Sequence, residues 1–301
     1  MAYLLVAHGD YCQTDERLPC DARGKQCVPC CMMFLVFVKN VKPAGQIKAD
    51  DLNHIIQDGS SLYMALNTDD TVSGFVNPQI LPDKIVYRGK RVYVEHKDVM
   101  SGVIRCSSDI DIEAAGLFSL EIAFTKCFAD NNDVILVFAG FAIAIHYERK
   151  THFYYVFDSH SRDENGLCCP DGTSVLGEMH SLKDMCTFID NLVTSCGQCP
   201  TSVQFDMHLF FLKAFFKPYF NAVHILDNQE GFKKIPKRKQ ANTSVGRKRP
   251  CLRDKMIGMS FTGCIDDRFV PDKFVDLPSK FDNLVSEGPD YVCSCCSQNL
   301  F

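Results

Sequence analysis

Two short segments of this sequence carry side chains whose types and spacing suit nucleophilic chemistry. The first is Gly24-Lys25-Gln26-Cys27-Val28-Pro29, which leads directly into the apolar run 32–38. Proline is favoured in the first turn of a helix, where its missing N–H leaves no hydrogen bond unmade. The pattern therefore predicts a loop that becomes a buried helix close to Cys27. A thiol there faces the positive end of the helix dipole, which favours the thiolate.

The second segment supplies a base for such a thiolate. Asp158 and His160 stand two residues apart at the end of the stretch 153–157, whose aromatic and β-branched residues predict a strand. Side chains at i and i+2 of a strand share one face, so the carboxylate can hold one ring nitrogen while the other takes a proton from a thiol. Each segment alone also fits a bland interpretation, a buried helix-start cysteine or a polar turn. Together they favour a cysteine nucleophile site.

The elements that must position these two segments can be located from the apolar pattern. Residues 52–63 have helical spacing behind acidic residues, which suit a helix N-terminus. The stretch 134–147 predicts one strand with a bulge or bend at Gly140, joined by a hairpin turn at 148–151 to the strand 153–157. The other expectations are an extended arm or strand over 1–8, helices over 28–39, 111–129 and 181–195, short β pieces at 85–87 and 91–94, a turn at 163–166 and a mixed aromatic segment over 203–220.

Composition bounds the class of protein. The chain has 301 residues, of which 46% are hydrophobic and 23% charged, as in a globular protein with a sizeable core, and its net charge of −5 argues against a protein that coats nucleic acid. The longest uncharged apolar run, 134–147, is 14 residues long, so no membrane association is expected.

The 17 cysteines raise the question of a secreted disulfide scaffold. The N-terminus has no basic segment ahead of its apolar stretch, so no signal peptide is expected. The cysteines are clumped, and their odd number leaves at least one unpaired. We therefore expect an intracellular protein of the cytoplasm or nucleus, with most cysteines acting as small buried apolar residues.

Several motifs together resemble a known protease family over roughly residues 9–195. They are Gly9-Asp10, Gly24-Lys25-Gln26-Cys27, the helix 51–63 and the run Phe157-Asp158-Ser159-His160-Ser161-Arg162-Asp163 with Asp171-Gly172-Thr173 behind it. This set resembles the deubiquitinating cysteine protease at the N-terminus of herpesvirus large tegument proteins. It resembles still more closely the relatives of that protease in animal genomes and mobile elements.

The resemblance implies an α+β, papain-like cysteine protease fold over residues 1–230, with a central, mostly antiparallel sheet packed with helices. It implies hydrolysis of ubiquitin or ubiquitin-like conjugates without a cofactor. Carried over by motif, Cys27 is the nucleophile, His160 the general base and acid, and Asp158 the group that orients His160. The family also uses a glutamine upstream of the cysteine as oxyanion donor, and Gln13 is the residue assigned to that role.

Two other chemistries compete for the same cysteines. Cys27-Val28-Pro29-Cys30 has the pattern of a thiol–disulfide redox site, which would need a strand directly upstream and a βαβ surround. Alternatively, Cys27 and Cys30 could join Cys196 and Cys199 in a zinc site with four cysteine ligands.

The C-terminal part has a different composition from the rest. The segment 231–255 contains two basic clusters between Lys233 and Arg249, which predict a linker and offer the one expected route to nucleic-acid contact or nuclear import. Residues 256–301 resemble an incomplete part of a Helitron-type transposon polyprotein, and Cys293 and Cys296 there are weak candidates for half of a metal site. An inactive binding or structural remnant of such a polyprotein is the alternative to an enzyme.

Overall fold

The computed structural model describes residues 3–66, 74–105 and 116–215. Its strands are β1 Leu4–His8, β2 Lys84–Tyr87, β3 Lys90–Val103, β4 Phe118–Ser119, β5 Asp133–Phe138, β6 Phe141–Glu148, β7 Phe153–Arg162, β8 Thr173–Met179 and β9 Gln204–Phe215. They form one sheet in the order β1-β8-β7-β6-β5-β9-β3-β2, with β4 beside β3. Only the short β3–β4 pair among these is parallel.

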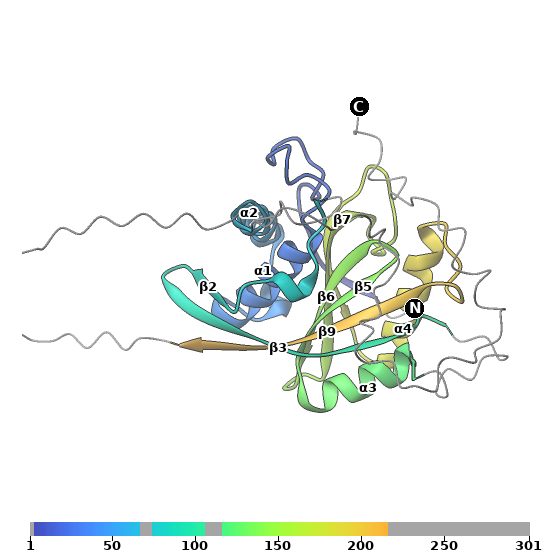
Figure 1. Cartoon of the computed structure of the whole chain (residues 1–301). Helices are drawn as coiled ribbons and strands as arrows, with labels where there is room; N and C mark the ends of the chain where they lie inside the picture. Colours follow the sequence, from blue (N-terminus) through green and yellow to red (C-terminus); the bar gives the residue numbers. More distant parts are fainter. Residues whose placement is uncertain (1–2, 67–73, 106–115, 216–301) are drawn as a thin grey trace, which may run out of the picture.

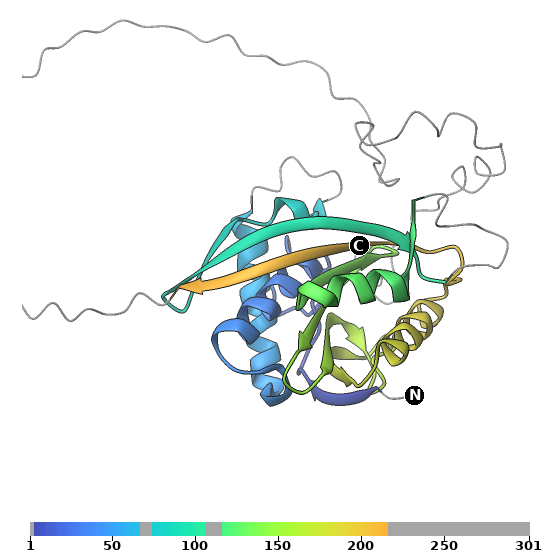
Figure 2. The same cartoon turned by 90° about the horizontal axis from the view of Figure 1, so that it is seen from below.

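Helices cover both faces of this sheet. Two of them, α1 (Cys27–Asn40) and α2 (Ala49–Ala65), lie on one side, and α3 (Leu120–Asp130) and α4 (Leu182–Ser195) lie on the other (Figures 1 and 2). Short 3₁₀ turns span Ala44–Gln46 and Pro78–Ile80. The buried apolar side chains accordingly form two clusters, one on each side of the sheet. A sheet covered on both faces explains why its central strands are apolar nearly throughout.

Helix α1 is the most buried helix, as its sequence predicts. Every residue from Cys27 to Phe37 is buried, because the helix lies between the sheet and α2. The ring of Phe34 stacks on that of Phe157 in β7, with 5.0 Å between centroids. On the other side, Gly59 of α2 allows close approach, since a Cβ there would lie 2.6 Å from the Cα of Cys30. The helix that begins at the thiol is therefore tightly fixed to the strand that carries the Asp-Ser-His motif.

The helix termini follow local chemistry. The Ser181 side chain accepts a hydrogen bond from the Asp184 N–H at the start of α4, and Asp51 accepts one from the Lys48 N–H at the start of α2. The predicted helix 111–129 is placed too early: α3 begins only after Ser119, because residues 118–119 pair with β3. Residues 111–115 of that prediction lie outside the described part of the chain.

The stretch 134–147 is not one bulged strand, as the sequence predicts, but the hairpin β5–β6. Its turn consists of Ala139 and Gly140, both with positive φ, 50° and 79°. Two successive residues with positive φ are typical of the tightest hairpin turns, whose twist matches that of the strands. The turn was hidden because both strands are buried on both faces and show no change of pattern at the bend. Its consequence is that β6 starts at Phe141, beside the end of β7.

The remaining expectations concern short strands and the C-terminal part. The pieces 85–87 and 91–94 are β2 and part of the longer β3, and the turns at 148–151 and 163–166 are confirmed. No helix in the described ranges is long and apolar enough to cross a membrane. The predicted boundary near 230, the linker 231–255 and the segment 256–301 lie outside the described residues.

Candidate active site

Asp158 and His160 form a buried pair at the end of β7. The Nδ1 atom of His160 lies 2.6 Å from Oδ1 of Asp158, and the backbone N–H of His160 donates to the same oxygen at 2.9 Å. Both side chains are almost fully buried, with exposures of 3% and 1%. The carboxylate therefore fixes the ring orientation and the tautomer with the proton on Nδ1, which leaves Nε2 to accept a proton.

The carboxylate of Asp158 is held in its ionised form by a second neighbour. Burial by itself disfavours the charge, but the positive charge of Arg162 and the hydrogen bonds from His160 lower the pKa of Asp158 well below its usual range. The Nε–H of Arg162 donates to Oδ2 at 2.6 Å. One oxygen of Asp158 thus serves His160 and the other serves Arg162.

Cys27 is the first residue of α1, where the sequence predicts the nucleophile. Burial raises the pKa of the Cys27 thiol to about 11. The backbone N–H groups of Val28 and Ala142 only partly offset that rise, and the charge of Asp158 adds to it. Burial of the sulfur therefore acts against the effect expected of the helix terminus, which favours the thiolate.

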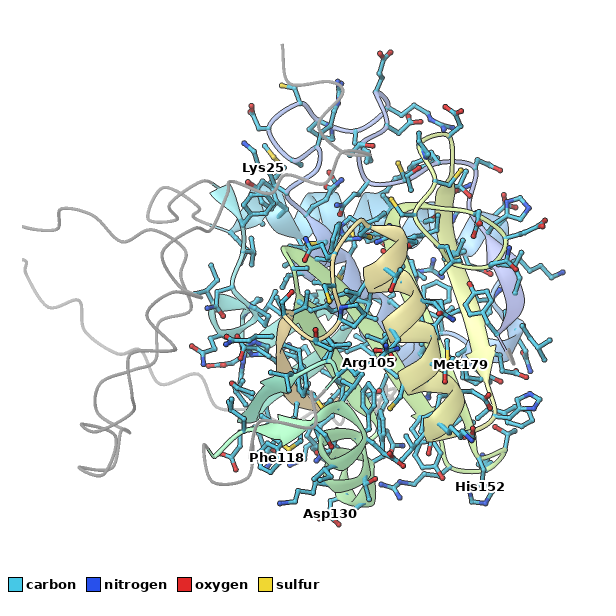
Figure 3. The ribbon with its side chains drawn as sticks, turned by 90° about the vertical axis from the view of Figure 1, so that its right-hand side faces the viewer. Lys25, Arg105, Phe118, Asp130, His152 and Met179 are labelled. Atoms are coloured by element: carbon cyan, nitrogen blue, oxygen red, sulfur yellow. The ribbon has the colours of Figure 1, made fainter. Side chains whose placement is uncertain are left out.

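Two adjacent residues of β6 lie beside the thiol and the imidazole. The Ala142 N–H acts on the thiol of Cys27 and lowers its pKa, while the ring of Phe141 packs edge-on against His160, with 5.1 Å between centroids. The start of α1 and the end of β7, more than a hundred residues apart in sequence, thus converge on the beginning of one strand. In Figure 3, Lys25 and His152 mark opposite ends of the molecule, and β7 runs from beside His152 towards the Lys25 end.

Gln13 joins this site through the end of β7. The ladder between β7 and β6 stops at Phe157, and beyond it the carbonyl of Ser159 accepts the N–H of Gln13 at 2.8 Å. The Ser159 hydroxyl donates to Oε1 of Gln13 at 3.0 Å, and the Gln26 side chain donates to the Gln13 carbonyl at 2.9 Å. The amide Nε2 of Gln13 is buried and has no partner among the described residues. The Gln13 side-chain amide is therefore a hydrogen-bond donor held in place by its other contacts.

Three residues of this site were not identified from the sequence: Gln26, Ser159 and Arg162. The first two tie Gln13 to the residues beside the thiol and the imidazole, contacts that no local pattern announces. Arg162 had a signal, because positions 158, 160 and 162 alternate along a strand and share one face.

The competing chemistries do not fit the structure. Turns, and no strand, lead directly into α1, and Cys30 is fully buried with its sulfur directed at the Ile56 carbonyl, 3.9 Å away, so Cys27 and Cys30 do not form an accessible redox pair. No three His, Cys, Asp or Glu side chains of the described residues gather as a metal site requires, which excludes the zinc arrangement with Cys196 and Cys199. Cys293 and Cys296 lie outside the described residues.

Five cysteines of the described ranges are buried free thiols: Cys12, Cys27, Cys30, Cys31 and Cys127.

Comparison with known families decides the relationship. The family model described as herpesvirus tegument protein, N-terminal conserved region, matches residues 12–215. The chain belongs to this family. The match contains all four predicted site residues, Gln13, Cys27, Asp158 and His160. A search of curated proteins finds no match.

A solved structure supports the fold of this tegument family member. The chain is similar to the ubiquitin-specific protease encoded by murine cytomegalovirus tegument protein M48, solved in complex with a ubiquitin-based suicide substrate. The TM-score is 0.58 at 14% sequence identity, over 73% of this chain and 89% of the M48 chain. The expected α+β, papain-like fold is confirmed.

Proposed function

We propose that this tegument family member is a cysteine-type hydrolase that acts on ubiquitin or ubiquitin-like conjugates. The observation that carries the proposal is the buried Asp158–His160 pair, 2.6 Å apart and in contact with Phe141, whose neighbour in β6, Ala142, acts on the thiol of Cys27. Membership of the tegument family and the ubiquitin-based substrate bound by the M48 protease support this substrate class.

The first step is transfer of the thiol proton of Cys27 to Nε2 of His160. The burial that raises the pKa of Cys27 makes this base necessary, because few molecules hold a thiolate at neutral pH without it. Asp158 stabilises the resulting imidazolium through Nδ1, at a short distance and away from water.

The thiolate then attacks the carbonyl carbon of the substrate's C-terminal glycine. The developing oxyanion receives hydrogen bonds from Nε2 of Gln13 and from the backbone N–H of Cys27, one of the first N–H groups of α1 that have no partner within the helix. His160 donates its proton to the departing lysine amine. A thioester on Cys27 remains, and water activated by His160 hydrolyses it to the free acid and thiol.

The burial of the site also restricts the substrate. Cys27 is only 5% exposed and His160 only 3%, so a bulky side chain next to the scissile bond would collide with the protein. A slim, extended tail that ends in glycine meets this restriction. A ubiquitin-type C-terminus is such a tail.

The test is labelling with a ubiquitin whose C-terminus carries an electrophile. The wild-type chain should form one covalent adduct, Cys27→Ala should form none, and Cys30→Ala should still react, because Cys30 faces α2. Adducts that persist in Cys27→Ala would move the nucleophile elsewhere. A folded wild-type chain that neither reacts nor cleaves ubiquitin conjugates would identify the chain as an inactive binding or structural remnant.

A further inference from the structure

Arg162 is a buried charge with no role in the mechanism above. Its side chain is 0% exposed, and its Nε–H donates to Oδ2 of Asp158 at 2.6 Å. The other carboxylate oxygen, Oδ1, accepts the hydrogen bond from Nδ1 of His160. A carboxylate bound on both oxygens cannot rotate about its last bond, so Arg162 and His160 fix each other's geometry through Asp158.

Arg162 has a second contact with the surroundings of the imidazole. Its guanidinium lies over the ring of Phe141, 5.3 Å from the centroid, and the edge contact of that same ring with His160 has an interplanar angle of 85°. Both groups that hold the imidazole, the carboxylate of Asp158 and the ring of Phe141, are therefore held in turn by Arg162. This arrangement is more than a simple charge pair, because it determines where the imidazole lies.

We propose that Arg162 is a positioning residue of the active site, which holds the carboxylate of Asp158 in place and keeps the imidazole of His160 aligned with Cys27. The proposal rests on the proposed function, since it concerns the same site. It adds a fourth member to the set of cysteine, histidine and aspartate and makes Arg162 necessary for turnover although it touches no substrate.

The positive charge of Arg162 has a consequence that packing alone lacks. Removal of a positive charge from a buried site raises the pKa of every proton-binding group that senses it. Asp158 on β7 would bind its proton more strongly, because the charge of Arg162 lowers the pKa of that carboxyl. The acid limb of the kcat/KM profile should therefore move to higher pH. The other titratable groups that interact electrostatically with Arg162 are Tyr3, Cys168 and Cys196, and Asp163 is a charged near neighbour.

The experiment compares Arg162→Gln and Arg162→Lys with the wild-type chain on a fluorogenic ubiquitin C-terminal amide. Arg162→Gln should lower kcat about 100-fold with little change in KM, since displacement of a catalytic group by about 1 Å has an effect of that order. Its acid limb should move to higher pH. Arg162→Lys keeps the charge but offers a single ammonium, so kcat should fall about 10-fold while the acid limb stays in place.

The control for a purely structural effect is Asp133→Asn. Asp133 forms the other buried carboxylate–histidine pair of the described residues, 2.7 Å from His146, and lies outside the site. Asp133→Asn should lower thermal stability and leave kcat and the pH profile unchanged. If Arg162→Gln does not fold, the Arg162→Lys profile carries the test.

Two results would overturn the inference. The first is that Arg162→Lys or Arg162→Gln retains the wild-type kcat. The second is that Arg162→Gln loses activity while the acid limb of its kcat/KM profile stays in place. If the wild-type chain itself has no activity on ubiquitin, the proposed function fails instead, so the two failures are distinguishable.

Discussion

Replacement of Asp158 by asparagine tests the site most directly, because the structure states what each oxygen does. Asp158 accepts from Nδ1 of His160 at 2.6 Å and from Nε of Arg162 at 2.6 Å, on opposite oxygens. Asparagine has one acceptor oxygen and one donor NH₂, so one of these two N–H groups must then face a donor. If the NH₂ faces His160, it selects the wrong tautomer; in either orientation the neutral amide leaves the buried charge of Arg162 without its counterion.

Both outcomes have a known scale. The wrong tautomer in a triad of this kind lowers kcat by about 10⁴-fold, or about 5 kcal/mol of barrier. An unpaired buried charge costs about 3–5 kcal/mol of unfolding free energy, which a domain with about 5–15 kcal/mol of stability can lose and still fold. We therefore expect Asp158→Asn to remain folded in urea titrations, to melt at a lower temperature and to turn over ubiquitin amide about 10⁴-fold more slowly.

The matched control makes the same chemical change in the other buried pair. Asp133→Asn alters a carboxylate 2.7 Å from His146, across β5 and β6, and should lower stability while kcat stays within about twofold of wild type. The reasoning is refuted if Asp158→Asn retains kcat within tenfold while folded. It is also refuted if Asp133→Asn reduces kcat as strongly.

Three further predictions follow from the same structure. The folded-state pKa of Asp158 is lowered, so its stabilising effect is complete above the unfolded value of about 3.9 and is lost as pH falls below that value; the urea-unfolding free energy of the wild type should fall in that range, and that of Asp158→Asn should fall less. Gln13→Ala should lower kcat about 10²–10³-fold with a small change in KM on ubiquitin amide, because it removes a hydrogen-bond donor to the oxyanion. A rise in KM of the same size, with kcat unchanged, would show that Gln13 acts in substrate binding instead. Gly59→Ala should destabilise the chain by about 1–3 kcal/mol, because its Cβ would lie 2.6 Å from the Cα and Sγ of Cys30; the exposed Ser61→Ala on the same helix should change the melting temperature little.

The helices could be predicted because their signals are local. Caps and apolar spacing locate α2 and α4, and the apolar run after Pro29 locates α1. The β5–β6 hairpin could not be found in this way, since its turn, Ala139-Gly140, contains no asparagine, aspartate or proline and its strands are buried on both faces. The full length of β3 was missed for a related reason: its long pairing with β9 is tertiary, more than a hundred residues away in sequence.

The site residues also divide into those that a local pattern identifies and those that depend on tertiary contacts. Asp158 and His160 are two residues apart, and strand geometry alone puts them on one face. Gln13 was assigned through the family resemblance, and the structure brings it to the site through Ser159. What sequence reasoning could not supply is the balance of energies at Cys27, because the loss of solvation around the sulfur depends on how the whole core closes over α1.

That balance yields a last prediction, on thiol reactivity. Burial raises the pKa of Cys27 to about 11, whereas hydrogen bonds from Thr201 lower the pKa of the exposed Cys199. At pH 7.5 a thiol of pKa about 11 is ionised to roughly 3 parts in 10⁴, against roughly one part in ten for an ordinary cysteine. Iodoacetamide should therefore modify Cys199 well before Cys27, as peptide mapping by mass spectrometry would show, while a ubiquitin electrophile should select Cys27.

If iodoacetamide prefers Cys199 and the ubiquitin electrophile prefers Cys27, the reactivity of Cys27 comes from His160 and a correctly bound substrate, not from a permanent thiolate. The buried site would then discriminate against unspecific electrophiles by desolvation and admit only a tail that brings its carbonyl to the sulfur. If iodoacetamide modified Cys27 first, the sulfur would already be ionised in the resting site. The helix terminus and an imidazolium at His160 would then outweigh burial, and the proton transfer that opens the proposed mechanism would not be needed.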